Sequence, residues 1–423
     1  MAAGEQGISD TTARGQAIII EVEGSGVVAE GKVTAAAGVE VASPLHSSRK
    51  TKLRTYPQIA RYPNQDVPVI PFISRSTSYS WLSNFYQCPI KMWGCDFLLG
   101  VEQVYQYAKA FVANSEEFMS RILNCNSALD CKKLGKDAEK LLTRRQWESA
   151  KIPIMWACLI AKFSQNSELA QKLRAMENSI LCEGNAHDRF WGIGFAEHAI
   201  LRKPNLVRTS SGLNILGRML MRVRDWLNDC FKPPLLMCVG DSMLVGVQLP
   251  GATLVTCPRA KIDHVLRTLS CTWHPGIESC LIVAGTNNLP ADSNRVSTPR
   301  RDSDGALLRI SPKLIVKSFD RSLQKLLTIC TFKTIFISEI LPRYCDPPTG
   351  SIVKQSRIQT GVCQVNKLLA GMISELNRRS SAKTQLIPVF EQFADASLFG
   401  QDGLHLSYNG KRKLETVLKS VIY

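Results

Sequence analysis

Three short segments in the second half of the chain combine side chains that could perform nucleophilic catalysis. In order, they read Gly240-Asp241-Ser242, Gly285-Thr286-Asn287-Asn288 and Asp402-Gly403-Leu404-His405. A hydrolytic serine needs a base, an acid that orients the base, and hydrogen-bond donors for the oxyanion. One short loop could place His405, as the base, and Asp402, as the orienting acid, near Ser242. The alternative is a degenerate scaffold that performs no chemistry.

The residues before Ser242 indicate how its hydroxyl could be presented. Leu235 to Val239 are five uncharged apolar residues, which is typical of a short buried parallel strand. Gly240 permits a sharp turn at the carboxyl end of that strand, where open α/β sheets build their sites. Taken alone, such a motif is more often a serine that merely caps the following helix.

The oxyanion donors are expected to be the Ser242 N–H, the Gly251 N–H and the Asn287 side-chain amide. In this order, the blocks resemble the SGNH (GDSL-like) hydrolases over residues 235–423. The third block departs from the family pattern, because Asn288 stands where an Asp is usual, although the oxyanion-donating Asn is retained. The resemblance implies a Ser-His-Asp esterase on a three-layer, flavodoxin-like parallel sheet.

The first half of the chain holds a second group of residues that could perform chemistry. Glu102 and Lys109 are seven positions apart, so two turns of one helix would place them on the same side. They could bind a polar ligand or form an ordinary surface pair. Asp188 could assist loss of a glycosidic leaving group while Trp191 stacks a base. Trp147 adds another ring, although tryptophans in the core are commoner than stacking ones.

The order of motifs in this half resembles the NADAR family. The matching segments are Trp81–Tyr86, Gly100–Gln106, Ala108-Lys109, Trp147–Lys151, Ala161–Phe163, Asp188–Gly192 and Gly212–Gly217. The resemblance implies an N-glycosidase acting on ADP-ribosylated or ribosylated nucleobase-type substrates, which include riboflavin-pathway intermediates. One position departs from the pattern: many members have His where this chain has Gln103, and glutamine cannot titrate as histidine does.

The same resemblance implies roles for individual residues. Glu102 would be the main catalytic carboxylate, which stabilises an oxocarbenium-like centre or activates water, and Asp188 would be a second carboxylate. The implied ligand-binding residues are Lys109, Trp147, Trp191 and Asn214.

Composition limits the partners and the compartment. The 423 residues carry a net charge of +16 with a pI near 9.3, which favours polyanions such as nucleic acid, or serves solubility alone. The 14 cysteines are scattered, so we expect free thiols in a reducing compartment, with no metal site and no cofactor. We find no secretory signal and no run of about 18 apolar residues. We therefore expect an intracellular protein, cytoplasmic or nuclear, without membrane contact.

The predicted elements divide the chain into two domains. We expect a disordered low-complexity tail over 1–66, a mostly helical α+β domain over 67–227, a linker over 228–234 and an α/β domain over 235–423. Strands are expected at Phe72–Ser76, Lys91–Leu98, Leu235–Val239, Thr253–Val255, Cys280–Ala284, Thr334–Ser338 and Gln385–Pro388. Helices are expected at Val101–Val112, Ser115–Asn124, Ala128–Leu134, Ile154–Ser164, Ser167–Ala175, Ile215–Asn228, Arg259–Leu269, Pro312–Thr328, Cys363–Arg378 and Asn409–Val421. Ser293–Gly305 is expected to be a mobile polar insert.

These observations predict an N-glycosidase fused to an esterase, and the unusual pairing on a basic chain indicates a protein of mobile-element origin acting near nucleic acid. The alternative is a non-catalytic protein that binds ADP-ribose, nucleotides or nucleic acid and carries a degenerate hydrolase scaffold. Turnover, as opposed to binding alone, separates the two hypotheses.

Overall fold

The computed structural model describes residues 67–423 except 77, 233, 290–310 and 344–351. The predicted tail over 1–66 and the Ser293–Gly305 insert lie outside the described residues. Within the described part, no helix is both long and apolar enough to cross a membrane. The thirteen cysteines described there are all free thiols, and most of them are buried.

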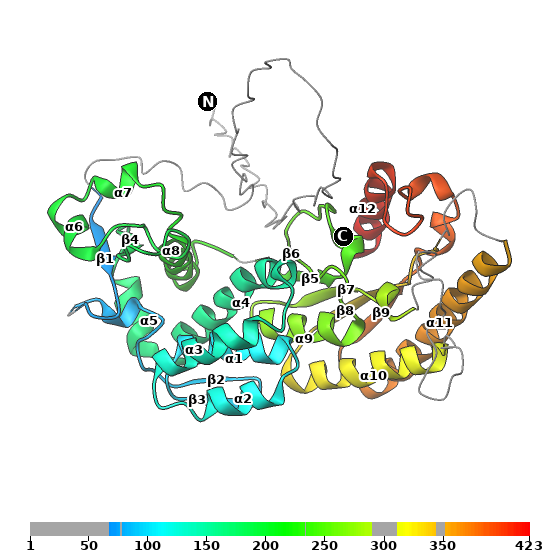
Figure 1. Cartoon of the computed structure of the whole chain (residues 1–423), viewed down its shortest axis with the longest axis horizontal. Helices are drawn as coiled ribbons and strands as arrows, with labels where there is room; N and C mark the ends of the chain where they lie inside the picture. Colours follow the sequence, from blue (N-terminus) through cyan, green and yellow to red (C-terminus); the bar gives the residue numbers. More distant parts are fainter. Residues whose placement is uncertain (1–66, 77, 233, 290–310, 344–351) are drawn as a thin grey trace, which may run out of the picture.

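The first half is a helical unit with two small sheets (Figure 1). Its helices are α1 (Val101–Val112), α2 (Glu116–Leu123), α3 (Ala128–Glu139), α4 (Arg144–Gln165), α5 (Ser167–Arg174), α6 (Glu197–Arg202), α7 (Leu206–Thr209) and α8 (Ile215–Leu227). Strands β1 (Val69–Phe72) and β4 (Ile180–Glu183) pair in parallel, and β2 (Ile90–Met92) and β3 (Cys95–Phe97) form an antiparallel pair. The sequence did not predict β4, α6 or α7.

Helix α4 is longer than predicted. The predicted helix starts at Ile154, directly after Pro153, which lacks the N–H that a helix interior needs. The structure instead begins α4 at Arg144 and keeps Pro153 inside it. Thr143 caps the helix: its hydroxyl accepts from Gln146 N, and the Gln146 side chain accepts from Thr143 N. This capping box and burial on both sides of the proline support the helix through Pro153.

The second half is built on a five-stranded parallel sheet with the order β6-β5-β7-β8-β9. The strands are β5 (Leu236–Gly240), β6 (Ala252–Thr256), β7 (Ser279–Val283), β8 (Thr334–Ser338) and β9 (Lys383–Ile387). The helices are α9 (Ile262–Thr272), α10 (Pro312–Ile329), α11 (Ile352–Arg379) and α12 (Tyr408–Ile422). In chain order of the strands this is 2-1-3-4-5, the flavodoxin-like arrangement. The predicted fold class is confirmed.

Side chains alternate between the two faces of this sheet, as the pleat requires. Leu236 and Cys238 of β5 join a cluster with Leu414 of α12, whereas Met237 and Val239 join residues of α9, α10 and α11. The sheet is therefore the middle of three layers. All strand carboxyl ends meet at one edge, where Ser242 follows β5.

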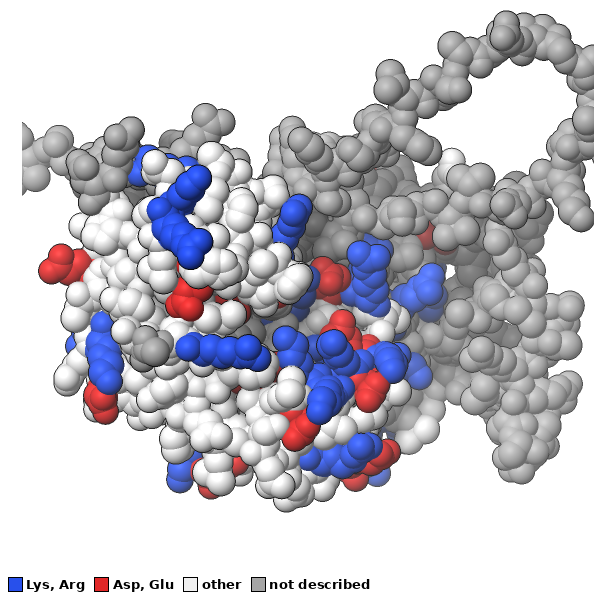
Figure 2. Space-filling view, turned by 60° about the vertical axis from the view of Figure 1, so that its left-hand side comes forward, with Lys and Arg blue, Asp and Glu red and all other residues white. Residues whose placement is uncertain are grey.

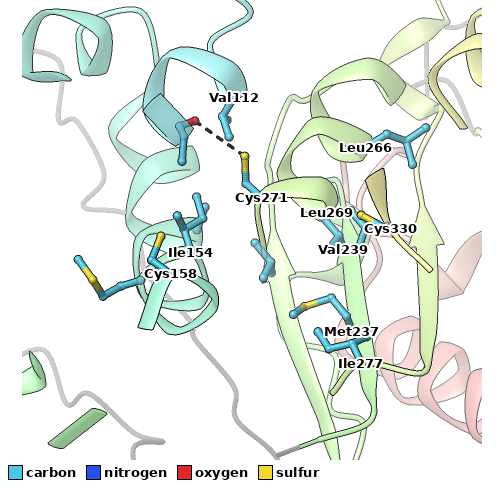
Figure 3. Packing of buried hydrophobic residues seen from close by; sticks show 14 of the residues in the cluster. Val112, Ile154, Cys158, Met237, Val239, Leu266, Leu269, Cys271, Ile277 and Cys330 are labelled. Atoms are coloured by element: carbon cyan, nitrogen blue, oxygen red, sulfur yellow. Dashed lines mark hydrogen bonds between the residues drawn. The ribbon is translucent and has the colours of Figure 1, made fainter. Parts of the chain in front are cut away.

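The two halves share one hydrophobic cluster. Val112 of α1 and Ile154 of α4 belong to the same buried group as Leu269 of α9 and Met237 of β5. Figure 3 shows this packing and the hydrogen bond from the Cys271 thiol of α9 to the Ala108 carbonyl of α1. The two predicted domains therefore do not have separate cores. Instead, α9 covers the sheet with one side and contacts α1 and α4 with the other.

Candidate active sites

The first candidate site lies where β5 ends. His405 Nε2 lies 3.2 Å from Ser242 Oγ, and His405 Nδ1 lies 2.5 Å from Asp402 Oδ2. This is the order of contacts that a nucleophile, a base and an orienting acid require. The side chains of Asp402 and His405 are about half exposed, so a substrate can reach them.

The turn after β5 presents the Ser242 hydroxyl to His405. A Cβ on Gly240 would lie 2.6 Å from Val283 O of the neighbouring strand, so only glycine fits there. Asp241, and not Ser242, caps the short 3-10 turn Ser242–Leu244, because its carboxylate accepts from Met243 N at 3.0 Å. The alternative role of Ser242 as a helix cap is therefore taken by its neighbour.

The carboxyl of Asp402 is held in its charged form. Partial burial alone would raise its pKa, but hydrogen bonds from the His405 ring and from the backbone N–H groups of His405 and Leu404 outweigh burial and lower it. A carboxylate at this position fixes the imidazole so that Nε2 faces Ser242. By contrast, burial raises the pKa of Asp241 to about 7, despite its hydrogen bond from Met243.

The prediction for Gly251 is wrong. Parallel register pairs Ala252 with Leu236 and Thr256 with Gly240, so Gly251 lies at the amino edge of the sheet. Ser242 follows the carboxyl edge, five residues along the strand, which is about 16 Å away. A donor from this neighbouring strand has to come from the loop 257–261 that follows β6. The sequence signal was misleading because Gly251-Ala252 precedes a strand instead of following one.

The Gly285 loop lies at the carboxyl edge, after β7. Asn287 Nδ2 donates to Ala260 O at 3.0 Å, which links this loop to the loop after β6. Asn288 Oδ1 accepts from Ile262 N at 3.0 Å. The amide of Asn287 has a second proton, so its role as an oxyanion donor stays a prediction. The unusual Asn288 supports the start of α9.

The second candidate site surrounds Glu102 in the first turn of α1. Only 5% of Glu102 is exposed, and its Oε1 accepts from Gln106 Nε2 at 2.7 Å. Burial raises the pKa of Glu102, and the Gln106 hydrogen bond and the charges of Lys132 and Lys109 partly offset that effect. A buried carboxyl one turn into a helix, next to cations, is an arrangement typical of catalytic sites.

Glu183, at the end of β4, is a site residue that we had not predicted. Burial, followed by the charges of Asp188 and Glu102, raises the pKa of its carboxyl to about 8, against a small opposing effect of Lys132. Its Oε2 is buried and, within the described part of the chain, has no hydrogen-bond partner. The sequence did not reveal this residue because no strand was expected at 180–183.

Two further buried acceptors near this carboxyl group lack partners among the described residues: Asn84 Oδ1 and Gln106 Oε1. Both belong to segments near Glu102, since Asn84 O accepts from Glu102 N and Gln106 donates to its carboxylate. Buried polar atoms are almost always paired in native proteins. Gln106 Oε1 packs against Gly135 of α3, which leaves Asn84 Oδ1 as the candidate acceptor for a ligand.

Asn214 has a structural role, and its predicted contact with a ligand stays a prediction. Asn214 is 1% exposed, its Oδ1 accepts from Glu183 N at 3.1 Å, and its Nδ2 donates to Leu181 O at 2.9 Å. Both ends of the amide are thus used inside the protein. Asn214 also adopts φ 49°, a left-handed conformation that asparagine tolerates better than most residues. Its role is to hold the end of β4 that carries Glu183.

Replacing Asn214 by alanine should destabilise the protein by about 3 kcal/mol, because two buried backbone groups lose their partners. The shift of the urea unfolding midpoint measures this loss. Asn228→Ala, at the exposed end of α8, is the matched control and should change stability by less than about 0.5 kcal/mol. Equal effects of the two substitutions would contradict the positioning role.

The remaining predicted residues surround this site in different ways. Asp188 Oδ1 accepts from Phe190 N and Trp191 N, which forms a turn beside Glu183. Trp191 packs edge-on against Tyr105. Lys109 Nζ lies 2.7 Å from Glu139 Oε2. These placements leave the predicted ligand contacts untested.

Trp147 is 4% exposed and packs against Tyr105, and the Lys109 ammonium lies 5.0 Å from its ring centroid. Gln103, where the family usually has His, is a structural residue. It accepts from Leu99 N and donates to the Ile122 and Leu123 carbonyls, so it ties α1 to α2.

Comparison with known proteins places the first half in a family. The protein-family model described as the NADAR domain matches residues 71–228. The N-glycosidase YbiA of Escherichia coli (strain K12) is 32% identical over 159 residues, which are 38% of this chain and 88% of that protein. The chloroplastic riboflavin biosynthesis protein PYRR of Zea mays is 29% identical over 186 residues, 40% of this chain and 28% of that protein.

One solved structure matches the C-terminal part of the chain. It is a GDSL-like lipase from Bacteroides thetaiotaomicron, with 12% identity and a TM-score of 0.32, and the match covers 45% of this chain and 88% of that one. At this low similarity the comparison carries no argument, so the function of the second half is argued from its own strand order and side-chain geometry.

Proposed function

The chain belongs to the NADAR family through residues 71–228, and on this premise we propose that its first half is an N-glycosidase. The substrate class is an ADP-ribosylated or ribosylated nucleobase. The observation that carries the proposal is the group of three carboxyls of Glu102, Glu183 and Asp188, in which Glu102 and the Oε2 atom of Glu183 are buried, and burial and then the other two charges raise the pKa of Glu183. Such surroundings suit the hydroxyl groups of a sugar.

The carboxyls of Glu102 and Glu183 have different surroundings, and we assign them different roles for that reason. Burial raises the pKa of Glu102, but the hydrogen bond from Gln106 and the charges of Lys132 and Lys109 act against that rise. The surroundings of Glu102 therefore favour the charged form more than those of Glu183 do. Glu183 faces two other carboxyls, and its pKa of about 8 keeps it protonated at neutral pH. Pairs of carboxyls whose pKa values are pushed apart supply an acid and a base.

The proposed reaction uses this pair. Glu183 donates its proton to the departing nitrogen while the N-glycosidic bond breaks, and the Glu102 carboxylate stabilises the oxocarbenium-like centre. Water then bonds to the anomeric carbon and gives a proton to Glu102. Proton exchange with solvent restores both carboxyls to their starting forms.

The rate should depend on the protonation of Glu183. As the pH rises through about 8, Glu183 loses its proton and kcat/KM for base release should fall. In Glu183→Gln this alkaline limb should disappear and the maximal kcat/KM should drop about 100-fold. The measurement is a pH profile of base release. Glu168→Gln, on the exposed face of α5, should keep the limb; a limb that persists in Glu183→Gln would disprove the acid role.

We propose a second activity, ester hydrolysis, for the second half. The Ser242–His405–Asp402 contacts at the carboxyl edge of a flavodoxin-like sheet support it. Ser242 attacks the ester carbonyl, His405 takes the hydroxyl proton and then gives it to the departing alcohol, and Asp402 holds the imidazole. Water releases the acyl group in a second round of the same steps.

The net positive charge of the chain supports a glycosidase substrate that is part of a polyanion such as nucleic acid. On the face of the first half in Figure 2, Lys and Arg side chains lie beside Asp and Glu side chains. Ion pairs such as Lys133–Asp130 in α3 and Lys140–Asp137 at its end neutralise part of the charge of this half. Polyanion binding through the excess positive charge should weaken steeply with salt.

The test is incubation of the purified chain with ADP-ribosylated guanine in DNA and, separately, with free ADP-ribosyl conjugates. Mass spectrometry then detects the separated base and sugar. Release from either substrate supports the glycosidase, and a preference for the DNA form supports the polyanionic setting. Binding of nucleotide without release would favour the non-catalytic binding protein. Hydrolysis of p-nitrophenyl acetate tests the esterase in the same preparation.

A further inference from the structure

Helix α4 of the glycosidase half contacts the loop that follows β6 in the other half. We propose that Gln146 and Ser149 of α4 are positioning residues for ester hydrolysis at Ser242, because they hold the loop 257–261 at the serine edge of the sheet. The inference rests on the proposed esterase function. It makes the esterase site incomplete without the glycosidase half.

The contacts are made by side chains on one face of α4. The Ser149 hydroxyl is 2% exposed and lies at hydrogen-bond distance from both Gln146 O and Thr256 O, the last residue of β6. Gln146 Nε2 donates to Pro258 O at 3.4 Å. Two carbonyls at the base of the loop are therefore directed at α4.

Because the peptide groups are trans, the directions of these two carbonyls also fix the directions of the amides that follow them. In a trans peptide the C=O and the following N–H point in opposite directions. Accordingly, the Thr256 carbonyl faces α4 while Cys257 N donates at 2.7 Å to Gly240 O, at the end of the serine strand. By the same rule, holding Pro258 O against Gln146 directs the next amide, that of Arg259, away from α4.

The loop is fixed from the other side as well. Ala260 N donates to Cys257 O, and Ala260 O accepts from Asn287 Nδ2. Arg259 adopts φ 64°, so the chain turns sharply there and depends on its anchors. The loop is thus clamped between α4 and the Asn287 loop, and both clamps act on peptides close to Ser242.

Helix α4 is itself firmly seated. Trp156, about two turns beyond Ser149 on the same face of α4, has its Nε1 3.2 Å from His274 Nε2. Elsewhere in the same half, Trp93 Nε1 donates to Ser270 O at 2.9 Å. Arg267 Nε donates to Val112 O. The packing in Figure 3 continues this contact through Ile154 and Cys158. The helix therefore gives the loop a rigid support.

The opposite face of α4 belongs to the glycosidase site. Trp147 packs on Tyr105, and the Lys151 ammonium lies 3.7 Å from the Phe190 ring centroid. At 100° per residue, residues 147 and 151 are about 100° to 160° around the helix from residues 146 and 149. One helix therefore contributes to both sites through separate faces, which lets the two effects be separated by mutation.

The test uses the full chain with the double substitution Gln146→Glu and Ser149→Ala. Glutamate keeps the capping-box acceptor for Thr143 N but cannot donate to Pro258 O, so α4 should still form. Ser164→Ala is the control: it lies on α4, its hydroxyl bonds Ala161 O in the same local pattern, and it is exposed.

Amide hydrogen exchange over 257–261 should accelerate at least about tenfold in the double variant and stay unchanged in the control. For p-nitrophenyl acetate, kcat should fall about tenfold with KM unchanged, since oxyanion stabilisation acts in the transition state. A purely structural defect would change KM and base release as well.

Unchanged exchange in the loop would overturn the proposal, and so would faster exchange with unchanged kcat. If the unaltered protein hydrolyses no ester, the esterase proposal fails by itself. The exchange measurement then still decides whether α4 holds the loop, because it does not depend on turnover.

Discussion

Ser242→Ala should reduce ester hydrolysis by about five to six orders of magnitude, to the level of the scaffold without a nucleophile. The hydroxyl lies 3.2 Å from His405 Nε2, and Asp402 holds the other ring nitrogen. Alanine removes only the attacking oxygen, so folding should be unaffected. Steady-state hydrolysis of p-nitrophenyl acetate and labelling by a fluorophosphonate both measure the loss.

The control for this substitution is Ser374→Ala, whose hydroxyl bonds Ala370 O on an exposed face of α11. It should retain full hydrolysis. Base release by the first half should remain normal in Ser242→Ala, because the two reactions use different carboxyls and hydroxyls. Retained ester cleavage in Ser242→Ala would show that another residue is the nucleophile.

Glu102→Gln should reduce release of the base about 1,000-fold or more while nucleotide binding is largely kept. The amide has nearly the same shape, and its oxygen can still accept from Gln106 Nε2, as the carboxylate does now. What it lacks is the negative charge that stabilises an oxocarbenium-like centre in a buried site. Mass spectrometry of the separated base and sugar gives the rate, and titration with ADP-ribose gives the affinity.

Glu116→Gln, in the exposed first turn of α2, is the matched control and should release base at the normal rate. A normal rate in Glu102→Gln would move the catalytic role to another carboxyl, Glu183 first. Absence of release in the unaltered protein, with ADP-ribose bound, would favour a binding function for this half.

The local sequence predicted the second half well because its signals are local. Uncharged apolar runs of about five residues predicted the strands, since a strand buried on both faces needs no polar residue. The alternation with helical periodicity predicted a parallel sheet, which the structure confirms, and the structure gives its strand order as β6-β5-β7-β8-β9. The segments around Ser242 and His405 were also recognisable, because a turn after a strand and an Asp two residues before a Leu-His pair are short-range patterns.

The sequence also identified the first half, through motifs that the comparisons bear out over residues 71–228. It did not predict β4, because four residues flanked by loops carry too weak a pattern. The error removed Glu183 from the predicted site, and it concealed the two backbone hydrogen bonds by which Asn214 holds the end of β4.

Other features depended on register and packing between distant segments, and only the tertiary structure decided them. Pairing of Ala252 with Leu236 moved Gly251 to the far edge of the sheet, which no local pattern can indicate. The pKa of about 8 at Glu183 comes from burial and from carboxyls that are distant in sequence. The contact of α4 with the loop after β6 joins residues more than 100 positions apart. The sequence by itself thus determined most of the helices and strands and most of the proposed reacting side chains. The sheet edge at which a residue lies, the protonation of Glu183 and the support of the loop after β6 arise from contacts between segments that are distant in the sequence.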